Sequence, residues 1–246
     1  MIYAILADIH SNLPALKTAI SWLENKGTIQ YIVLGDIVGY GPHPNECIEA
    51  IQKLSPAILI KGNHDYASSE DIPLDDFNPY AKEAILWTRS HLLPGNINYL
   101  RNLPERAQLS GILLVHGSPR DPLNEYLTDD IKFVRCTEMP DIPKVCFVGH
   151  SHYPLLFVRQ KGGPASHSLL LDGDSIQLAP GNYYALNPGS IGQPRDGDPR
   201  LSFALWDSDK STFTIVRLKY DISRTQKDML KAGLPEFLVH RLETGK

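Results

Sequence analysis

Five short apolar runs, rich in β-branched residues, each end at a residue of a type that can bind a metal ion. The runs are Ile2–Ala7, Tyr31–Leu34, Ala57–Ile60, Ile112–Val115 and Val145–Val148. Continuous apolar runs of this length are typical of strands buried on both faces. The polar residues that follow them are Asp8 and His10, Asp36, Asn63 with His64 and Asp65, His116, and His150 with His152. Because ligands of open α/β sheets bind at the carboxyl ends of the strands, this series indicates a binding site there.

The segments between the early runs have helical periodicity. Leu13–Lys26 and Pro44–Leu54 place apolar residues on one helical face, so the order strand–helix–strand predicts parallel βαβ units. After Gly149 the pattern changes to short runs joined by Gly, Pro and Asp turns. We expect five more strands, at Leu155–Gln160, Ser168–Leu171, Tyr183–Asn187, Leu201–Trp206 and Phe213–Lys219. They predict a second, mixed or antiparallel sheet packed against the first, in a mixed α/β (α+β) fold.

Three further helices are expected. Tyr80–Leu93 follows the turn-rich Pro73–Pro79, and we expect this segment, about 73–93, to cover the mouth of the site and select substrates. Two short helices, Ser223–Lys231 and Pro235–Leu242, are expected within 222–246. The chain has 246 residues and no repeat or linker, which predicts a single domain over 1–246.

Composition excludes several classes of function. The net charge is −4, the pI is near 6.1, and no run of Lys or Arg exceeds two residues, which argues against binding of long nucleic acids. The three cysteines have no C-x-x-C spacing and are expected to be reduced thiols. The apolar N-terminus stops at Asp8, and no apolar stretch approaches the ~20 residues of a membrane span. We therefore expect a cytoplasmic protein that does not bind membranes. Its oligomeric state stays open, and a homo-oligomer is one of the alternatives.

The polar residues suit a pair of metal ions. Asp8 with His10, and His150 with His152, are i, i+2 pairs, which project to the same side in extended backbone. The set of carboxylate, amide and imidazole groups exceeds the three or four protein ligands that one Zn²⁺ needs. It fits two ions such as Mn²⁺, Fe or Zn²⁺ that share one carboxylate. Taken singly, Asp8 and Asp36 would also fit helix caps or turns, and His116 a core histidine. The ordered set favours metal binding.

These residues resemble the signature of the calcineurin-like metallophosphoesterases, D-x-H, G-D, G-N-H-[DE], H-G and G-H-[ST]-H. The matching segments, in order, are Asp8–His10, Gly35–Asp36, Gly62–Asp65, His116–Gly117 and Gly149–His152. Asn187-Pro188-Gly189-Ser190 further resembles the small bacterial phosphodiesterase branch. The resemblance implies a four-layer αββα sandwich.

The resemblance also implies the roles of individual residues. One metal ion would be bound by Asp8, His10, Asp36 and His152. The other would be bound by Asp36, Asn63, His116 and His150, with Asp36 bridging. Asp36 would thereby be catalytic as well as a ligand, because a hydroxide that bridges the ions would attack phosphorus. His64 would meet the substrate phosphate and protonate or stabilise the leaving group.

One departure from the family pattern bears on the substrate. Protein phosphatases of this superfamily read G-D-x-V-D-R-G, and symmetrical dinucleoside tetraphosphatases also carry an Arg after the bridging Asp. Here the segment is Gly35-Asp36-Ile37-Val38-Gly39-Tyr40-Gly41, without that Arg. The sequence therefore predicts a phosphodiesterase acting on a small phosphorylated substrate, such as a nucleotide. The alternatives are a dinucleoside polyphosphate hydrolase, a phosphomonoesterase for proteins or small molecules, a nuclease, and a non-catalytic metal-binding interaction module. A metallo-β-lactamase-type site is excluded because no H-x-H-x-D-H occurs.

Residues that could contact the substrate lie near these motifs. The candidates are Asn12, Tyr40, His43, Arg120 and Arg195. Arginine suits phosphate because its guanidinium group can donate two parallel hydrogen bonds. Phe77 and Trp87 are expected to pack the covering helix rather than stack on a base.

Overall fold

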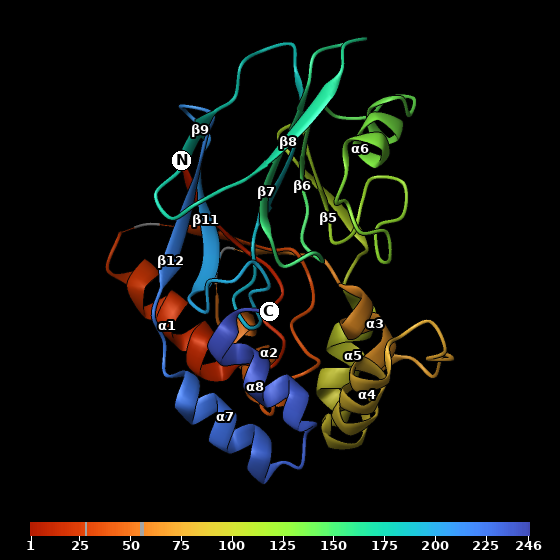
Figure 1. Cartoon of the computed structure of the whole chain (residues 1–246), viewed down its shortest axis with the longest axis vertical. Helices are drawn as coiled ribbons and strands as arrows, with labels where there is room; N and C mark the ends of the chain where they lie inside the picture. Colours follow the sequence, from red (N-terminus) through yellow and green to blue (C-terminus); the bar gives the residue numbers. More distant parts are fainter. Residues whose placement is uncertain (28, 55–56) are drawn as a thin grey trace.

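The computed structural model of the chain describes residues 1–27, 29–54 and 57–246. Its described part contains two six-stranded sheets that pack face to face (Figure 1). The first sheet consists, in spatial order, of β3 (Ala57–Leu59), β2 (Gln30–Val33), β1 (Ile2–Leu6), β11 (Leu201–Asp207), β12 (Thr212–Leu218) and β9 (Ser175–Gln177). The second consists of β4 (Arg106–Leu109), β5 (Ile112–Val115), β6 (Val145–Phe147), β10 (Tyr183–Pro188), β7 (Pro154–Arg159) and β8 (Ala165–Leu169).

Strand β1 shows why the early strands are apolar throughout. Its side chains alternate between two buried environments, because successive residues of a strand point to opposite faces. Tyr3 and Ile5 pack between the two sheets with residues such as Phe147, whereas Ala4 and Leu6 pack against the outer helices of the first sheet. Both faces are therefore withdrawn from water. The predicted parallel pairing of β1 with β2 and of β2 with β3 is confirmed.

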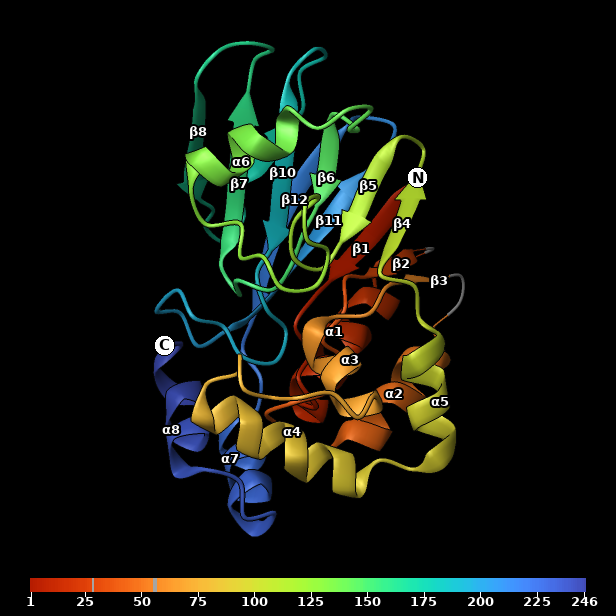
Figure 2. The same cartoon turned by 90° about the vertical axis from the view of Figure 1, so that its right-hand side faces the viewer.

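Helices cover the outer face of each sheet. The described helices are α1 (Leu13–Glu24), α2 (Pro44–Gln52), α3 (Asn63–Ser69), α4 (Pro79–His91), α5 (Pro94–Asn102), α6 (Asp130–Thr137), α7 (Ile222–Lys231) and α8 (Glu236–Thr244). Helices α1 and α2 bury Leu16 and Ile48 against the first sheet. Helix α6 packs Phe133 and Cys136 against Phe157 and other residues of the second sheet (Figure 2). The expected four-layer αββα sandwich is confirmed.

The assignment of strands to the two sheets was wrong in part. We expected the five early strands to share one sheet, but β5 and β6 belong to the second, and β11 and β12 belong to the first. Strand β11 pairs antiparallel with β1, and β10 pairs parallel with β6. Each sheet thus combines strands from early and late parts of the chain. Pairing between strands that are so far apart in the sequence cannot be predicted from the order in which the strands occur.

The sequence also missed several short elements. They are β4, β9, α3, α5 and α6. Strand β8 lies at Ala165–Leu169 instead of Ser168–Leu171, because pairing with β7 defines it while most of its side chains are exposed. Strands β4, β8 and β9 lie at sheet edges, where side chains carry little apolar pattern.

The carboxyl ends of β1, β2, β5 and β6 meet at one end of the sandwich, next to α3 (Figure 2). The loops that leave these strands carry the predicted ligand residues. All three cysteines are free and buried. Among the described helices, none is both long and apolar enough to cross a membrane. That 1–246 forms a single domain stays a prediction.

Candidate functional site

One group of buried side chains joins the loops after β1 and β6. Asp8, His10 and His152 place one potential ligand atom each within 4.8 Å of one another. His152 Nε2 lies 3.4 Å from Asp8 Oδ1, and His10 Nε2 lies 3.9 Å from the same oxygen. All three side chains are almost wholly buried. The group has the composition and spacing of a metal site.

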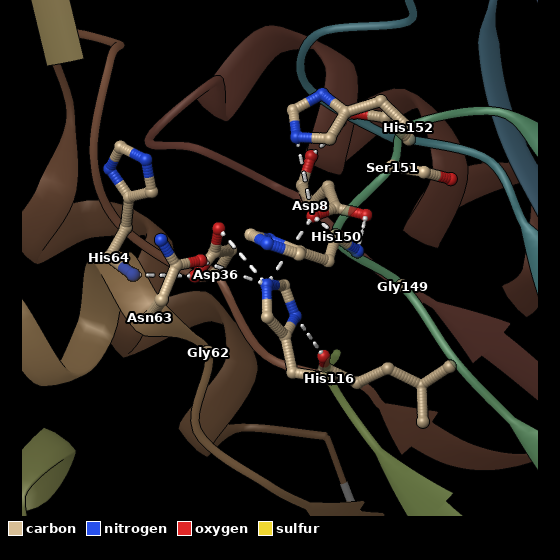
Figure 3. A network of polar contacts seen from close by, with 12 residues as sticks. Asp8, Asp36, Gly62, Asn63, His64, His116, Gly149, His150, Ser151 and His152 are labelled. Carbon is tan, nitrogen blue, oxygen red and sulfur yellow. Dashed lines mark hydrogen bonds and ion pairs between the residues drawn. The ribbon is translucent and has the colours of Figure 1, made fainter. Parts of the chain in front are cut away.

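A second group lies beside the first (Figure 3). It consists of Asp36, His116 and His150, whose ligand atoms also lie within 4.8 Å of one another. Asp36 Oδ2 lies 3.3 Å from His116 Nε2 in its own group and 3.5 Å from His10 Nε2 in the neighbouring group. Asn63 Oδ1 lies 3.2 Å from His116 Nε2. Asp36 is therefore placed between the two groups.

Each of the four imidazoles is oriented by a backbone carbonyl. The pairs are His10 Nδ1 with Val38 O at 3.1 Å, His116 Nδ1 with Leu34 O at 2.8 Å, His150 Nε2 with Asn124 O at 3.2 Å, and His152 Nδ1 with Gln193 O at 2.6 Å. A ring nitrogen that donates to a carbonyl carries the hydrogen, so the other nitrogen of a neutral ring keeps its lone pair. This is the arrangement in which proteins present histidine to metal ions.

Two features within the groups would be unfavourable without a bound cation. His10 Nε2 and His152 Nε2 lie 3.0 Å apart, although both rings have their Nδ1 against a carbonyl. Two lone pairs would face one another at that distance if both rings were neutral. Asp36 Oδ2 is buried and has no hydrogen-bond partner among the described residues. The donor set therefore fits a pair of bound metal ions, which would relieve both contacts.

The electrostatics of Asp36 and of three of the four imidazoles agree with this fit. Burial lowers the pKa of His10 and His152 well below the usual value, and lowers that of His150 to about 3, so these rings are neutral. Burial opposes the charge of Asp36, but the neighbouring His116 and His64 outweigh burial and hold the pKa of Asp36 well below its usual range.

His116 and Asp8 differ: burial opposes the charge of His116, but Asp36 and Asp8 raise its pKa to about 9, and burial raises the pKa of Asp8 to about 7. Metal binding would require the loss of a proton from His116 and an ionised Asp8, as metal ligands must be deprotonated.

The backbone of the ligand loops differs from our expectation. Asp8, His10, His150 and His152 have φ values of 52°, 48°, 66° and 63°, in the left-handed region rather than in extended backbone. The extended backbone that we expected from the i, i+2 spacing is therefore wrong. Asp8 and His10 still join one group, but His150 and His152 enter different groups. Left-handed conformations of non-glycine residues cost free energy and are concentrated at functional sites.

Close approach of two loops requires glycine at position 62. A Cβ atom on Gly62 would collide with the backbone N and the side chain of Asp36. The same approach lets the His64 backbone N–H donate to Asp36 Oδ1 at 2.9 Å. Glycine thus brings the start of α3 against the loop after β2.

His64 stands next to the two groups but joins neither (Figure 3). Its ring centroid lies 4.9 Å from that of His10 and 4.4 Å from that of Tyr40. Burial lowers the pKa of His64 to about 4, and its Nδ1 has no hydrogen-bond partner among the described residues. The side chain also lines a cavity of about 540 Å³ next to Asn63 and His150.

Two of the five proposed substrate contacts face the site. Tyr40 lines the cavity, and its ring lies 5.7 Å from the guanidinium carbon of Arg195. Arg195 has a buried Nε without a hydrogen-bond partner among the described residues. After burial, the positive charge of Arg195 is the largest cause of the low pKa of His152. The charge of Arg195 therefore acts on the ligand groups, and its guanidinium also donates to Gln193 Oε1 at 3.0 Å.

The other three proposed contacts are engaged elsewhere. Asn12 caps α1 and donates to Gly192 O and to the Tyr220 hydroxyl. His43 Nε2 lies 3.1 Å from Asp228 Oδ2 on α7. Arg120 donates to Glu125 Oε1 at 3.2 Å. That these three residues contact a substrate stays a prediction.

The loop that carries Gln193 and Arg195 is fixed by a buried ion pair between Arg217 and Asp196, whose side chains are only 2 % and 3 % exposed. We expect Arg217→Met to lower the free energy of unfolding by about 3–5 kcal/mol, because Asp196 would stay buried without its partner. Urea denaturation measures this change. Arg200→Met is the matched control, since Arg200 is 33 % exposed and its pairs are open to solvent. A loss of unfolding free energy below about 1 kcal/mol for Arg217→Met would show that the ion pair with Asp196 is not buried as described.

Comparison with known proteins places the chain in a family. A family model described as the calcineurin-like phosphoesterase superfamily domain matches residues 1–211. The chain belongs to this superfamily. An uncharacterised protein of Methanocaldococcus jannaschii is 38 % identical over 248 residues, which cover 99 % of this chain and 98 % of the relative.

Two solved structures match over nearly their whole length; both support the fold, and the first also supports the membership. The metallophosphoesterase of Sphaerobacter thermophilus is 40 % identical with a TM-score of 0.86, over 100 % of this chain and 99 % of that one. A hypothetical protein of Pyrococcus horikoshii is 25 % identical with a TM-score of 0.80, over 100 % and 98 % of the two chains. The resemblance stated from the motifs is confirmed.

Some residues of this candidate site were not assigned a role from sequence. Asp65 accepts from the backbone N–H groups of Gly62 and Val38, both at 3.0 Å, and so ties two ligand loops together. Ser190 Oγ donates to Asp8 O at 2.8 Å, and Asn187 Nδ2 donates to Gly149 O. The motifs around Asp65 and Ser190 were recognised, but their hydrogen bonds depend on loops that meet only in the folded chain. Tyr126, which stacks on His150, carries no motif signal.

Proposed function

We propose that this chain is a metal-dependent phosphoesterase that hydrolyses small phosphodiesters. The observation that carries the proposal is Asp36, whose buried Oδ2 lies between the two His/Asp groups without a hydrogen-bond partner among the described residues. Membership of the calcineurin-like phosphoesterase superfamily supports the reaction class.

The side chains divide into two ligand sets. Asp8, His10, Asp36 and His152 would hold one metal ion, and Asp36, Asn63, His116 and His150 would hold the other. The donor set of imidazole, carboxylate and amide suits Mn²⁺, Fe or Zn²⁺. When bound, a pair of such ions supplies an activated water nucleophile and neutralises charge on phosphoryl oxygens.

His64 and Arg195 would contact the substrate. The His64 imidazole lines the cavity next to the ligand groups. Its pKa of about 4 leaves it neutral in the free protein. The negative charge of a bound phosphate would raise that pKa and favour the protonated ring, which would then donate its proton to the oxygen of the departing alcohol. The His64 backbone N–H donates to Asp36 Oδ1, which holds the start of α3 beside the ligand groups. The guanidinium of Arg195, near Tyr40, would bind a non-bridging phosphate oxygen. Tyr40 packs against the rings of His10 and His64 and limits their movement.

Removing the Arg195 guanidinium tests its proposed role in binding the phosphate group. We expect Arg195→Ala to raise the KM for a phosphodiester by roughly 10-fold or more, because a hydrogen bond to a charged group contributes about 1.5–3 kcal/mol. Steady-state kinetics measure the change. Arg120→Ala is the matched control, since the Arg120 guanidinium binds Glu125 and should leave KM unchanged. Equal effects of the two variants would remove Arg195 from the substrate site.

Hydrolysis of bis-p-nitrophenyl phosphate tests the proposed function as a whole. Metal-stripped protein should be inactive, and restoring Mn²⁺, Fe²⁺ or Zn²⁺ should restore turnover. Turnover of p-nitrophenyl phosphate in parallel separates diesterase from monoesterase activity. No turnover of either ester with any of these ions, in protein that binds two of them, would contradict the proposal and favour a non-catalytic binding module.

A further inference from the structure

A cavity of about 540 Å³ opens directly onto the candidate site. Asn63, His64 and His150 form the wall that it shares with the ligand groups. Its other walls come from Tyr40, from Tyr66 on α3 and Ala81 on α4, from the segment between these helices, and from the loop at 121–126. A volume of this size is typical of sites for small organic ligands and is larger than a phosphate group requires. The cavity therefore has room for the organic part of a phosphodiester.

The charge of the cavity limits what can enter. Two carboxylates, Asp76 and Asp121, line it, and no Lys or Arg is among its described lining residues. A polyphosphate chain carries several negative charges and needs cationic side chains to bind them. The group that occupies the cavity should accordingly be uncharged or cationic.

The aromatic walls indicate a planar occupant. Tyr66, Phe77 and Tyr126 line the cavity together with Tyr40. Tyr126 stacks on His150 with ring centroids 3.7 Å apart, and Phe77 meets His64 edge to face at 5.6 Å. Flat aromatic side chains bind flat ring systems through their faces, and each stacked base contributes about 1–3 kcal/mol. The expectation that Phe77 only packs the covering helix was therefore incomplete, because Phe77 contributes to the hydrophobic clusters and also lines the cavity.

We propose that this cavity binds an uncharged nucleoside, so that the preferred substrates are nucleoside phosphodiesters rather than dinucleoside polyphosphates. The base would lie against the aromatic walls, and the hydroxyl and amino groups of the nucleoside would donate to Asp76 and to the amide oxygen of Asn124. The preference among substrates rests on the proposed phosphodiesterase function, whereas binding of a free nucleoside does not.

Calorimetric titration of the Mn²⁺-loaded protein with adenosine tests binding without turnover. Phe77→Leu keeps an apolar side chain but removes the aromatic face, and should weaken adenosine binding by roughly 5-fold or more. Phe77→Tyr should retain binding. Tyr80→Leu is the matched control, because Tyr80 on α4 stacks on Phe237 and does not line the cavity. Absence of saturable adenosine binding, or equal loss in Phe77→Leu and Tyr80→Leu, would overturn the proposal.

Charge reversal tests the exclusion of polyphosphates. The wild-type kcat/KM should be at least 10-fold higher for adenosine 2′,3′-cyclic phosphate than for diadenosine tetraphosphate. Asp76→Lys should reduce this ratio, because it places a cation in the cavity. Asp75→Lys is the control, since Asp75 pairs with Lys82 and lies outside the lining. A wild-type preference for the tetraphosphate, or equal effects of the two variants, would contradict the inference.

The two proposals fail in different ways. Metal-dependent hydrolysis of bis-p-nitrophenyl phosphate without adenosine binding would leave the phosphodiesterase function intact and overturn the nucleoside site. Adenosine binding that depends on Phe77, in a protein that hydrolyses no phosphodiester, would uphold the site and overturn the function.

Discussion

Asp36→Asn should reduce kcat/KM for bis-p-nitrophenyl phosphate by roughly 10³-fold or more. Asp36 Oδ2 lies within 3.5 Å of imidazoles from both ligand groups, and its Oδ1 accepts the backbone N–H of His64. Asparagine has nearly the same shape and keeps a hydrogen-bond acceptor, but it lacks the negative charge that two cations would share. Metal ions contribute several kcal/mol to stabilising the transition state, and about 1.4 kcal/mol corresponds to 10-fold in rate.

The control for this substitution is Asp71→Asn, because Asp71 is fully exposed and lies outside the site. It should retain wild-type turnover. Circular dichroism and the count of bound Mn²⁺ separate loss of the fold from loss of the site. A folded Asp36→Asn protein with more than about a tenth of wild-type activity would contradict the bridging role of Asp36, since that loss is no larger than about 1.4 kcal/mol.

His64→Ala should have the second largest effect, and its size should depend on the leaving group. General acid catalysis contributes about 10²–10⁴-fold, and most of it when the departing alcohol is a poor leaving group. For adenosine 2′,3′-cyclic phosphate we expect a loss in kcat within that range. For bis-p-nitrophenyl phosphate the loss should be smaller, because p-nitrophenolate departs without full protonation. Steady-state kinetics on both substrates measure the difference.

A structural role for His64 would give another result. Its ring contacts Tyr40 and His10, so a packing defect would lower the activity on both substrates by a similar factor. His64→Gln keeps a side chain that can donate a hydrogen bond in this space but cannot transfer a proton. If His64→Gln restored turnover of the cyclic nucleotide to the wild-type rate, His64 would not be the proton donor.

Most single helices and strands of this structure could be predicted from the sequence, but less of the pairing between distant strands could. Strand β1 and helix α1 were predicted because their apolar residues follow the spacing of one element. The placement of β11 beside β1 could not be predicted, because it depends on pairing between residues about 200 positions apart. The weakly patterned edge strands β4 and β9 were missed for lack of an apolar signal.

The site shows the same division. Its ligand residue types were visible because metal chemistry restricts them to a few side chains, and their order resembles the family signature. Their conformation was not, since the left-handed backbone of Asp8 and His152 results from contacts between loops. The carbonyl groups that orient each imidazole could not be predicted either, because every residue has the same backbone carbonyl whatever its side chain. Asn12 was proposed as a substrate contact, but its amide binds protein groups that come from distant parts of the sequence.

The most direct test of the account is the number of metal ions that each chain binds. Metal-stripped protein should be dialysed against Mn²⁺, and protein and bound metal should then be quantified together with phosphodiester turnover. We expect two ions per chain, with turnover appearing as both sites fill, and fewer than two in Asp36→Asn. One ion or none per chain in the active wild-type protein would contradict the two-metal site.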